Sequence, residues 1–327
     1  MLKKFKNILI ILIVFTGNNA YSLSSSSYLI ANTAINLLDF EKANEHFSLF
    51  DIELDESDLH NKLLIFVNLN LIGEASKIAD KIIKIDDSSQ EAWLVYLTEA
   101  KITNNLKIFK KYKQQKKQNI ELIDYIFYSN NGSLKNDIEI AKAIFEIVQA
   151  SVYENKNNVD YKFLLFYLSI ANIIDPNFNE GYFYSAQIYS ALKNFDKADI
   201  FYNKVKRNHR LFIESQISIA SNNNKRGLFE KSEQHLKKLI NIYKENVELS
   251  VALANLYRMK KKYAEAISHY TNIINLKNSL FDDHWRIFYL RGICYERLNQ
   301  WNLAEKDFLY SLKINPNSSQ VLNYLAY

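Results

Sequence analysis

Residues 285–318 read WRIFYLRGICYERLNQWNLAEKDFLYSLKINPNS, and the spacing of small and large side chains in this stretch predicts its structure. Gly292 precedes Tyr295 by three positions, and Ala304 precedes Phe308 by four. Such spacings place both members of each pair on one side of a helix. The small residue lets two helix backbones approach closely, and the aromatic side chain fills the groove beside it. We therefore expect two antiparallel helices joined by a short turn.

The same pattern recurs along the chain. An eight-residue box that starts with an aromatic residue and has Ala or Ser at its fourth position occurs at residues 40–47, 195–202, 229–236, 263–270 and 301–308. Its small residues Ala198, Ser232 and Ala266 are spaced 34 residues apart, and Ala304 follows after 38. Equal spacing over successive copies indicates a repeat architecture.

The spacing, the boxes and the closing Pro316 together resemble the tetratricopeptide repeat (TPR) family. The resemblance implies an all-α fold, a TPR-type α-solenoid in which antiparallel helix pairs stack into a right-handed superhelix. It is clearest in residues 179–318, which would form four repeats, and weaker in residues 23–120. The pattern blurs after Gln90, and we assign a divergent helical pair to residues 121–178, with helices at 138–153 and 161–174. Residues 319–327 would begin a further repeat or a capping helix, and we expect the natural chain to continue beyond them.

The first 22 residues have the layout of a secretory signal peptide. Lys3, Lys4 and Lys6 precede the apolar run 8–15, and small residues follow up to Ser22, where we expect cleavage. The run is less than half of the roughly 20 apolar residues that a membrane span needs. The sequence thus predicts export to the periplasm or cell envelope without a transmembrane helix in the mature chain, with an uncleaved anchor as the alternative.

Composition excludes several classes of function. With 48% hydrophobic and 24% charged residues in 327, the chain is globular rather than disordered, and only 6 Gly and 2 Pro favour helices over strands. Three N-terminal lysines account for most of the formal charge of +5, so positive and negative charges nearly balance in the rest of the chain. Nucleic acid is therefore not an expected partner. The single cysteine, Cys294, excludes an internal disulfide and a Cys-based zinc cluster.

The sequence also contains no HExxH, GxxxxGK or GxSxG motif, so we expect no catalytic, cofactor-binding or metal-binding residues. His46, His235 and His269 fall at equivalent places in their boxes, and we assign them structural or exposed roles. Cys294, beside Tyr295, is interpreted as a packing residue.

In TPR folds the first helix of each pair lines a concave groove, so the resemblance predicts the groove residues. These are Phe183, Gln187, Ser190, Ile217, Ser221, Asn224, Val251, Asn255, Arg258, Tyr289, Ile293 and Glu296. Family members that hold the carboxylates of chaperone tails carry lysines where this chain has Phe183, Ile217, Val251 and Tyr289. A carboxylate clamp is therefore not expected, and an extended or helical segment laid into an apolar, amide-rich groove fits better. The alternative is that the chain's own N-terminal half or a missing terminal helix covers the groove.

These observations favour a non-catalytic scaffold or assembly factor of the cell envelope that binds a peptide or protein segment. One alternative is a TPR targeting module of a longer enzyme, with the catalytic domain beyond Tyr327. Another is an adaptor that contacts anionic membranes through the lysines of residues 107–117. The simpler interpretation of that lysine run is a solvated helix face.

Overall fold

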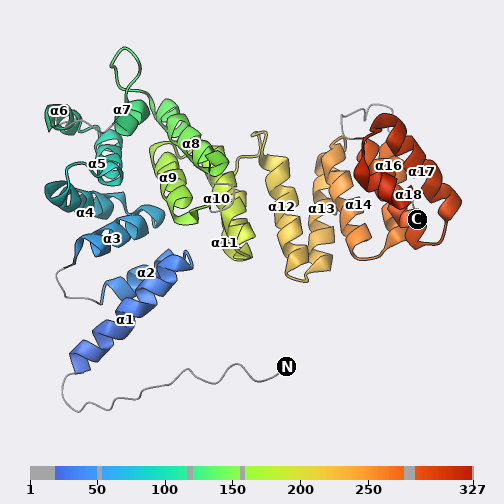
Figure 1. Ribbon diagram of the computed structural model, residues 1–327, viewed down its shortest axis with the longest axis horizontal. Helices are drawn as coiled ribbons and strands as arrows, with labels where there is room; N and C mark the ends of the chain where they lie inside the picture. Colours follow the sequence, from blue (N-terminus) through green and yellow to red (C-terminus); the bar gives the residue numbers. More distant parts are fainter. Residues whose placement is uncertain (1–18, 50–53, 116–120, 155–158, 276–283, 326–327) are drawn as a thin grey trace. The chain divides into compact units, whose positions relative to one another are not determined.

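The computed structural model describes residues 19–49, 54–115, 121–154, 159–275 and 284–325. Within these ranges the chain forms 18 helices and no strand beyond an isolated antiparallel bridge between Tyr128 and Leu134 (Figure 1). The predicted all-α fold is thereby confirmed. The chain divides into two compact units, one up to Phe178 and one from Asn179, which we call unit 1 and unit 2.

The helices follow one another with short connections. Those of unit 1 are α1 (Asn19–Asn36), α2 (Phe40–Phe47), α3 (Glu56–Asn68), α4 (Ile72–Ile85), α5 (Gln90–Ile102), α6 (Leu106–Gln115), α7 (Glu121–Phe127), α8 (Asp137–Glu154) and α9 (Tyr161–Ile174). Those of unit 2 are α10 (Asn179–Ala191), α11 (Phe195–Lys204), α12 (Phe212–Lys225), α13 (Phe229–Ile242), α14 (Val247–Met259), α15 (Tyr263–Asn275), α16 (Trp285–Arg297), α17 (Trp301–Ile314) and α18 (Ser319–Leu325).

Each box marks the start of the second helix of a hairpin. Helices α2, α11, α13, α15 and α17 begin at the first residue of the five boxes. The small residue of every box is almost fully buried, with exposed fractions between 0% and 1%. At Ser232 the hydroxyl also finds a partner, because its Oγ donates to the carbonyl of Ala220 at 2.7 Å. The helix-pair interpretation of the boxes is confirmed.

The turn between the two helices of a hairpin has the same backbone geometry seven times. The residue two positions before the second helix has a positive φ, between +55° and +82°; we call it the turn residue. The seven turn residues are Leu38, Asn70, Asn104, Lys193, Gly227, Lys261 and Asn299. The N–H of the following residue donates to the carbonyl five positions earlier, as Lys262 does to Tyr257 at 2.9 Å. This is the Schellman ending of a helix, and it puts the seven hairpins in a common register.

The turn residues make a testable prediction. A side chain in the left-handed region costs roughly 1–2 kcal/mol, a cost that glycine avoids. We expect Lys261→Gly (φ +61°) to raise the free energy of unfolding by about 1 kcal/mol, and Gly227→Ala (φ +82°) to lower it by a similar amount. Urea denaturation of both variants measures the two changes. Equal stability of both variants and the parent chain would contradict the assigned geometry.

Close packing inside the hairpins explains the choice of glycine at one position. A Cβ atom added at Gly292 in α16 would lie 2.7 Å from a ring carbon of Phe308 in α17, well inside van der Waals contact. In unit 2 such contacts continue from hairpin to hairpin. One cluster of buried side chains runs from Ala220 to Cys294, and a second one centres on Ala304 and Phe308.

Some expectations lie outside the described residues. Residues 1–18 of the predicted signal peptide are among them, and α1 begins at Asn19, before the expected cleavage point. Among the helices of the described part of the chain, none combines the length and apolarity that crossing a bilayer requires.

Candidate functional site

Unit 2 has a hollow of about 670 Å³ between the first helices of three successive hairpins, α12, α14 and α16. Its floor is apolar, and its rim carries charged and amide groups. It is lined by Ile217, Glu245, Asn246, Val247, Glu248, Val251, Ala252, Asn255, Arg286, Ile287 and Leu290. A hollow of this size accommodates several side chains of a ligand. We call it the unit 2 groove.

Three of the twelve residues predicted for a groove line this hollow, namely Ile217, Val251 and Asn255. The sequence interpretation did not identify Ala252 and Leu290, each of which directly follows a predicted groove residue. It also did not identify the first-turn residues Glu248 and Arg286. Helical periodicity could have identified Glu248, because it lies three positions before Val251 and so on the same face of the helix.

The other predicted residues lie elsewhere. Phe183 is a correction, because it is only 2% exposed and therefore does not line a groove. Its ring packs edge-on against Tyr202, with the ring centroids 5.7 Å apart, in the core of the α10–α11 hairpin. Tyr289 packs against Tyr324 of α18 with ring centroids 5.7 Å apart. The remaining ones are at least partly accessible on α10, α12, α14 and α16 outside the hollow: Gln187, Ser190, Ser221, Asn224, Arg258, Ile293 and Glu296.

Hydrogen bonds orient the amides of the groove. The hydroxyl of Tyr270 in α15 donates to Oδ1 of Asn255 at 2.8 Å. Tyr270 is fully buried, and burial raises its pKa, so the phenol keeps its proton at neutral pH. The amide of Asn255 is therefore fixed with its oxygen toward α15. At the rim, Oδ1 of Asn246 accepts the N–H of Leu249 at 2.9 Å and caps the start of α14.

The charges of the groove lie at its rim. Glu245, Glu248 and Arg286 are exposed to solvent, whereas the floor residues Val251 and Leu290 are partly buried and apolar. Two carboxylates against one guanidinium give this rim a net negative character. The arrangement therefore suits an apolar ligand surface flanked by basic groups.

Cys294 is a residue of α16 and is completely buried. Burial raises the pKa of its thiol to about 11, and the guanidinium of Arg258 offsets only part of that shift. A thiol with this pKa is protonated at neutral pH and is a poor nucleophile. The geometry agrees with the packing role that the sequence indicated.

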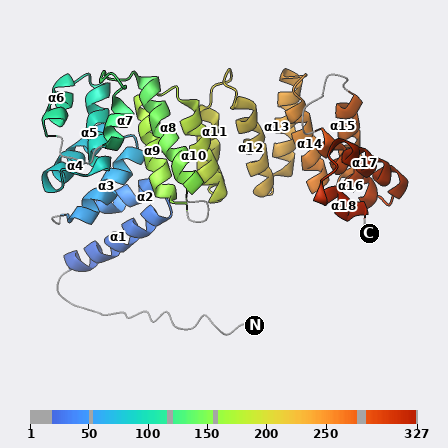
Figure 2. The ribbon, with the colours of Figure 1, turned by 45° about the horizontal axis from the view of Figure 1, so that its top comes forward.

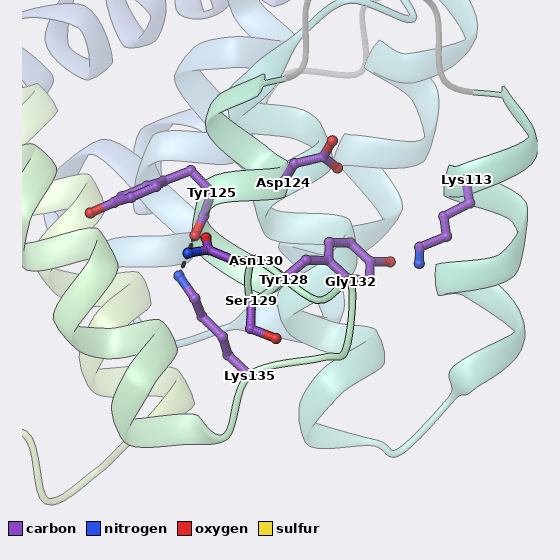
Figure 3. A pocket seen from close by; sticks show the side chains of 8 residues that line it. All are labelled: Lys113, Asp124, Tyr125, Tyr128, Ser129, Asn130, Gly132 and Lys135. Carbon is purple, nitrogen blue, oxygen red and sulfur yellow. Dashed lines mark hydrogen bonds between the residues drawn. The ribbon is translucent and has the colours of Figure 1, made fainter.

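A second hollow, of about 580 Å³, lies in unit 1 beside α6, α7 and the loop that follows (Figure 3). It is lined by Lys113, Asp124, Tyr125, Tyr128, Ser129, Asn130, Gly132 and Lys135. Both ammonium groups are held by the protein: Lys113 lies 4.2 Å from the ring centroid of Tyr128, and Lys135 donates to the carbonyl of Tyr125. Figure 3 shows Lys113 and Lys135 on opposite sides of Tyr128 rather than converging on one point. This hollow is a weaker candidate for a charged ligand.

The lysine run of residues 107–117 has its described part on α6. Phe109 and Tyr112 are buried, whereas Lys107, Lys110 and Lys111 are exposed. The apolar side chains thus face the protein and the lysines face solvent, as a solvated helix face requires. Lys116 and Lys117 lie outside the described residues.

All three box histidines are partly buried. His269 stacks on Tyr257 with ring centroids 5.3 Å apart. Burial lowers the pKa of His269, and also that of His235, because it disfavours the charged imidazolium. Within the described ranges, no cluster of three or more His, Cys, Asp or Glu side chains is arranged to hold a metal ion.

These lowered pKa values predict a pH dependence of stability. The unfolded chain takes up protons on both imidazoles near pH 6.5, whereas the folded chain takes them up only at lower pH. The unfolded state therefore binds more protons in this window, and the free energy of unfolding should fall as the pH drops below about 7. Urea denaturation at pH 7.5 and pH 5.5 measures the slope, and His269→Phe with His235→Phe should reduce it. An unchanged slope in the double variant would exclude these histidines as its source.

Comparison with known proteins agrees with the helical repeats. The tetratricopeptide repeat family model matches residues 180–207, which span α11 and all but the first residue of α10. A TPR repeat-containing protein of Methanocaldococcus jannaschii is 23% identical over 270 residues, which are 82% of this chain and 38% of that protein. The chain thus spans well under half the length of this curated relative. Together with the seven hairpins, these findings support a tetratricopeptide repeat protein.

Solved structures with similar helical arrangements include a tetratricopeptide repeat protein from Parabacteroides merdae. It is 14% identical, covers 93% of this chain and 98% of its own, and superposes with a TM-score of 0.41. YrrB, described as a TPR protein with an unusual peptide-binding site, is also 14% identical. It covers 55% of this chain and 98% of its own, with a TM-score of 0.37.

Proposed function

We propose that this chain is a non-catalytic interaction scaffold that binds a peptide or protein segment in the unit 2 groove. The observation that carries the proposal is the hollow itself, in which apolar side chains of three successive hairpins form a floor beside an oriented amide. With Oδ1 of Asn255 engaged by Tyr270, its NH₂ group is the part that can donate to a ligand carbonyl. Burial of apolar ligand side chains on Val251 and Leu290 would supply most of the affinity.

A role in the cell envelope forms part of this proposal and rests on the N-terminal sequence alone. The lysines and the short apolar run of residues 1–22 are typical of an exported protein. An assembly factor that holds another envelope protein would combine such a leader with a peptide-binding repeat array. The competing proposal, a targeting module of a longer enzyme, requires a catalytic domain outside these 327 residues.

Selection from a random peptide library displayed on phage tests the groove. Peptides retained by the purified chain are measured against the parent, Val251→Asp and the matched control Leu309→Asp, whose side chain on α17 is 54% exposed. Because Val251→Asp places a carboxylate on the apolar floor, we expect at least about a tenfold loss of affinity, equivalent to about 1.4 kcal/mol. The control should bind like the parent. Retained peptides that ignore Val251→Asp, in a variant with unchanged circular dichroism, would refute the groove as the binding site.

A further inference from the structure

Helix α9 occupies, within unit 1, the surface that corresponds to the unit 2 groove. It packs against α8 and also against α3 and α5, the first helices of two hairpins (Figures 1 and 2). Oγ of Ser169 donates to Oδ1 of Asn68 on α3 at 3.1 Å, and Nζ of Lys162 donates to Oδ1 of Asn36 on α1 at 3.1 Å. Helix α9 therefore packs on the first helices α3 and α5 and reaches α1 through the side chain of Lys162.

The turn residues allow the positions of the two surfaces to be compared. Asn36 and Asn68 each precede the turn residue of their hairpin by two positions. In unit 2, Val251 and Asn255 precede theirs by ten and six positions. The residues ten and six positions before the turn in α3 are His60 and Leu64, and both line a hollow of about 230 Å³ that α3 shares with α9 and α5. The hollow beside α9, in the wall that this helix contacts, is thus lined from α3 by the same two positions that α14 contributes to the unit 2 groove.

The occupant of this wall is an apolar helix with a few polar side chains at its edges. The sequence of α9 is YKFLLFYLSIANII, and its residues 164–168 are all buried. Its backbone groups are satisfied within the helix, so the wall needs to supply only apolar contact and a few side-chain acceptors. Asn36 and Asn68 supply those acceptors to Lys162 and Ser169.

The unit 2 groove has matching chemistry. An extended ligand exposes an N–H or a carbonyl at each residue, which would need partners along the floor. The floor residues Val251, Ile287 and Leu290 are apolar, and the polar groups stand at the rim or at Asn255. A helix meets this distribution better than a strand does, and the exposed carboxylates of Glu245 and Glu248 favour basic residues on its flank.

We propose that the ligand of the unit 2 groove is an amphipathic helix of a partner protein. It would present apolar residues at positions i, i+3 or i+4, and i+7 to the floor, a hydroxyl or amide to Asn255, and Lys or Arg toward Glu245 and Glu248. This inference rests on the proposed function and specifies the conformation and side-chain pattern of its ligand. Helix α9 is an example within the chain of a helix that packs on first helices.

The probe that tests this inference is a synthetic peptide with the sequence of α9, residues 161–174. It carries a hydrocarbon staple that holds it helical and a C-terminal lysine tail for solubility. The matched peptide has the same composition apart from Leu168→Pro and no staple, so it cannot form the helix. Fluorescence anisotropy gives the affinity of each peptide for the full chain, for Leu290→Asp in the groove and for Leu309→Asp on the exposed face of α17.

We expect the stapled helix to bind the parent and Leu309→Asp alike, and to bind Leu290→Asp at least about tenfold more weakly. The proline peptide should bind the parent at least about tenfold more weakly than the stapled helix. Equal binding of both peptides, with both sensitive to Leu290→Asp, would overturn the helical ligand while leaving a peptide-binding groove. Binding of the stapled helix that is absent or insensitive to Leu290→Asp would also overturn it. The proposed function itself fails only when the library selection yields no peptide that depends on Val251.

Discussion

Replacing Asp307 by alanine is expected to lower the free energy of unfolding of unit 2 by about 3–5 kcal/mol. The carboxylate is 4% exposed and accepts two hydrogen bonds from the guanidinium of Arg291, from Nε and from Nη2, both at 2.7 Å. Nη1 of the same arginine donates to Thr271 on α15, so the pair links two adjacent hairpins. Removing the acid leaves a largely buried cation without its counter-ion, which is the costly case for a buried ion pair.

Urea denaturation, with hydrogen exchange to locate the weakened helices, measures this loss. The informative control is Arg291→Met combined with Asp307→Leu, which replaces the whole pair by apolar side chains. Such replacements are often neutral, so the double variant should recover most of the stability. A loss below about 1 kcal/mol for Asp307→Ala would mean that solvent screens the pair more than its burial indicates.

Phe308→Ala is the second change with a large expected effect, about 3–5 kcal/mol of lost stability. The ring is fully buried, lies against Gly292 and has Tyr324 with its ring centroid 5.2 Å away, so its removal leaves a cavity between α16, α17 and α18. Leu309→Ala is the matched control, because the adjacent side chain is 54% exposed and its loss should change stability by no more than about 0.5 kcal/mol.

Thermal unfolding measures the loss of stability in each alanine variant, and hydrogen exchange shows which helices are weakened. Because stability in a repeat array is summed from hairpins and their interfaces, the loss in Phe308→Ala should appear first as faster hydrogen exchange in α16–α18. Similar exchange in both variants would show that Phe308 does not hold these helices together.

The hairpins were predictable from the sequence where small residues mark the contact of two helices. The starts of α11, α13, α15 and α17 follow from Ala198, Ser232, Ala266 and Ala304. The α5–α6 hairpin did not show this pattern, although its turn has the same geometry as the others. Seven positions before and five after the turn residue, the hairpins of unit 2 have small residues, whereas the α5–α6 hairpin has Leu97 and Phe109 around Asn104. Both are buried, so large side chains fill an interface at which the unit 2 hairpins have small residues.

The groove was only partly predictable. Helical periodicity indicated which side of α12 and α14 faces away from the core, and three of the residues it selected, Ile217, Val251 and Asn255, line one hollow. Phe183 occupies the equivalent position in α10 but is buried, because Tyr202 lies close enough to cover it. Periodicity gives the face of a helix, whereas coverage depends on neighbours that are distant in the sequence.

The position of α9 illustrates the same limit. Its apolar composition indicates a buried helix, but nothing local shows that its neighbours include α3, about one hundred residues earlier in the chain, as the bond from Ser169 to Asn68 records. Such long-range packing is decided by complementary surfaces rather than by the periodicity of either helix.

The constant distance between the turn residue and the groove row also determines which insertions and deletions the chain can tolerate. One residue added within the first helix of a hairpin rotates everything before it by about 100° relative to the turn, which would exchange wall and core residues. A residue added in the connection between hairpins leaves each register intact. Length differences among related sequences should therefore concentrate between hairpins. Within this chain, the spacing of the boxes already increases from 34 to 38 residues between the last two.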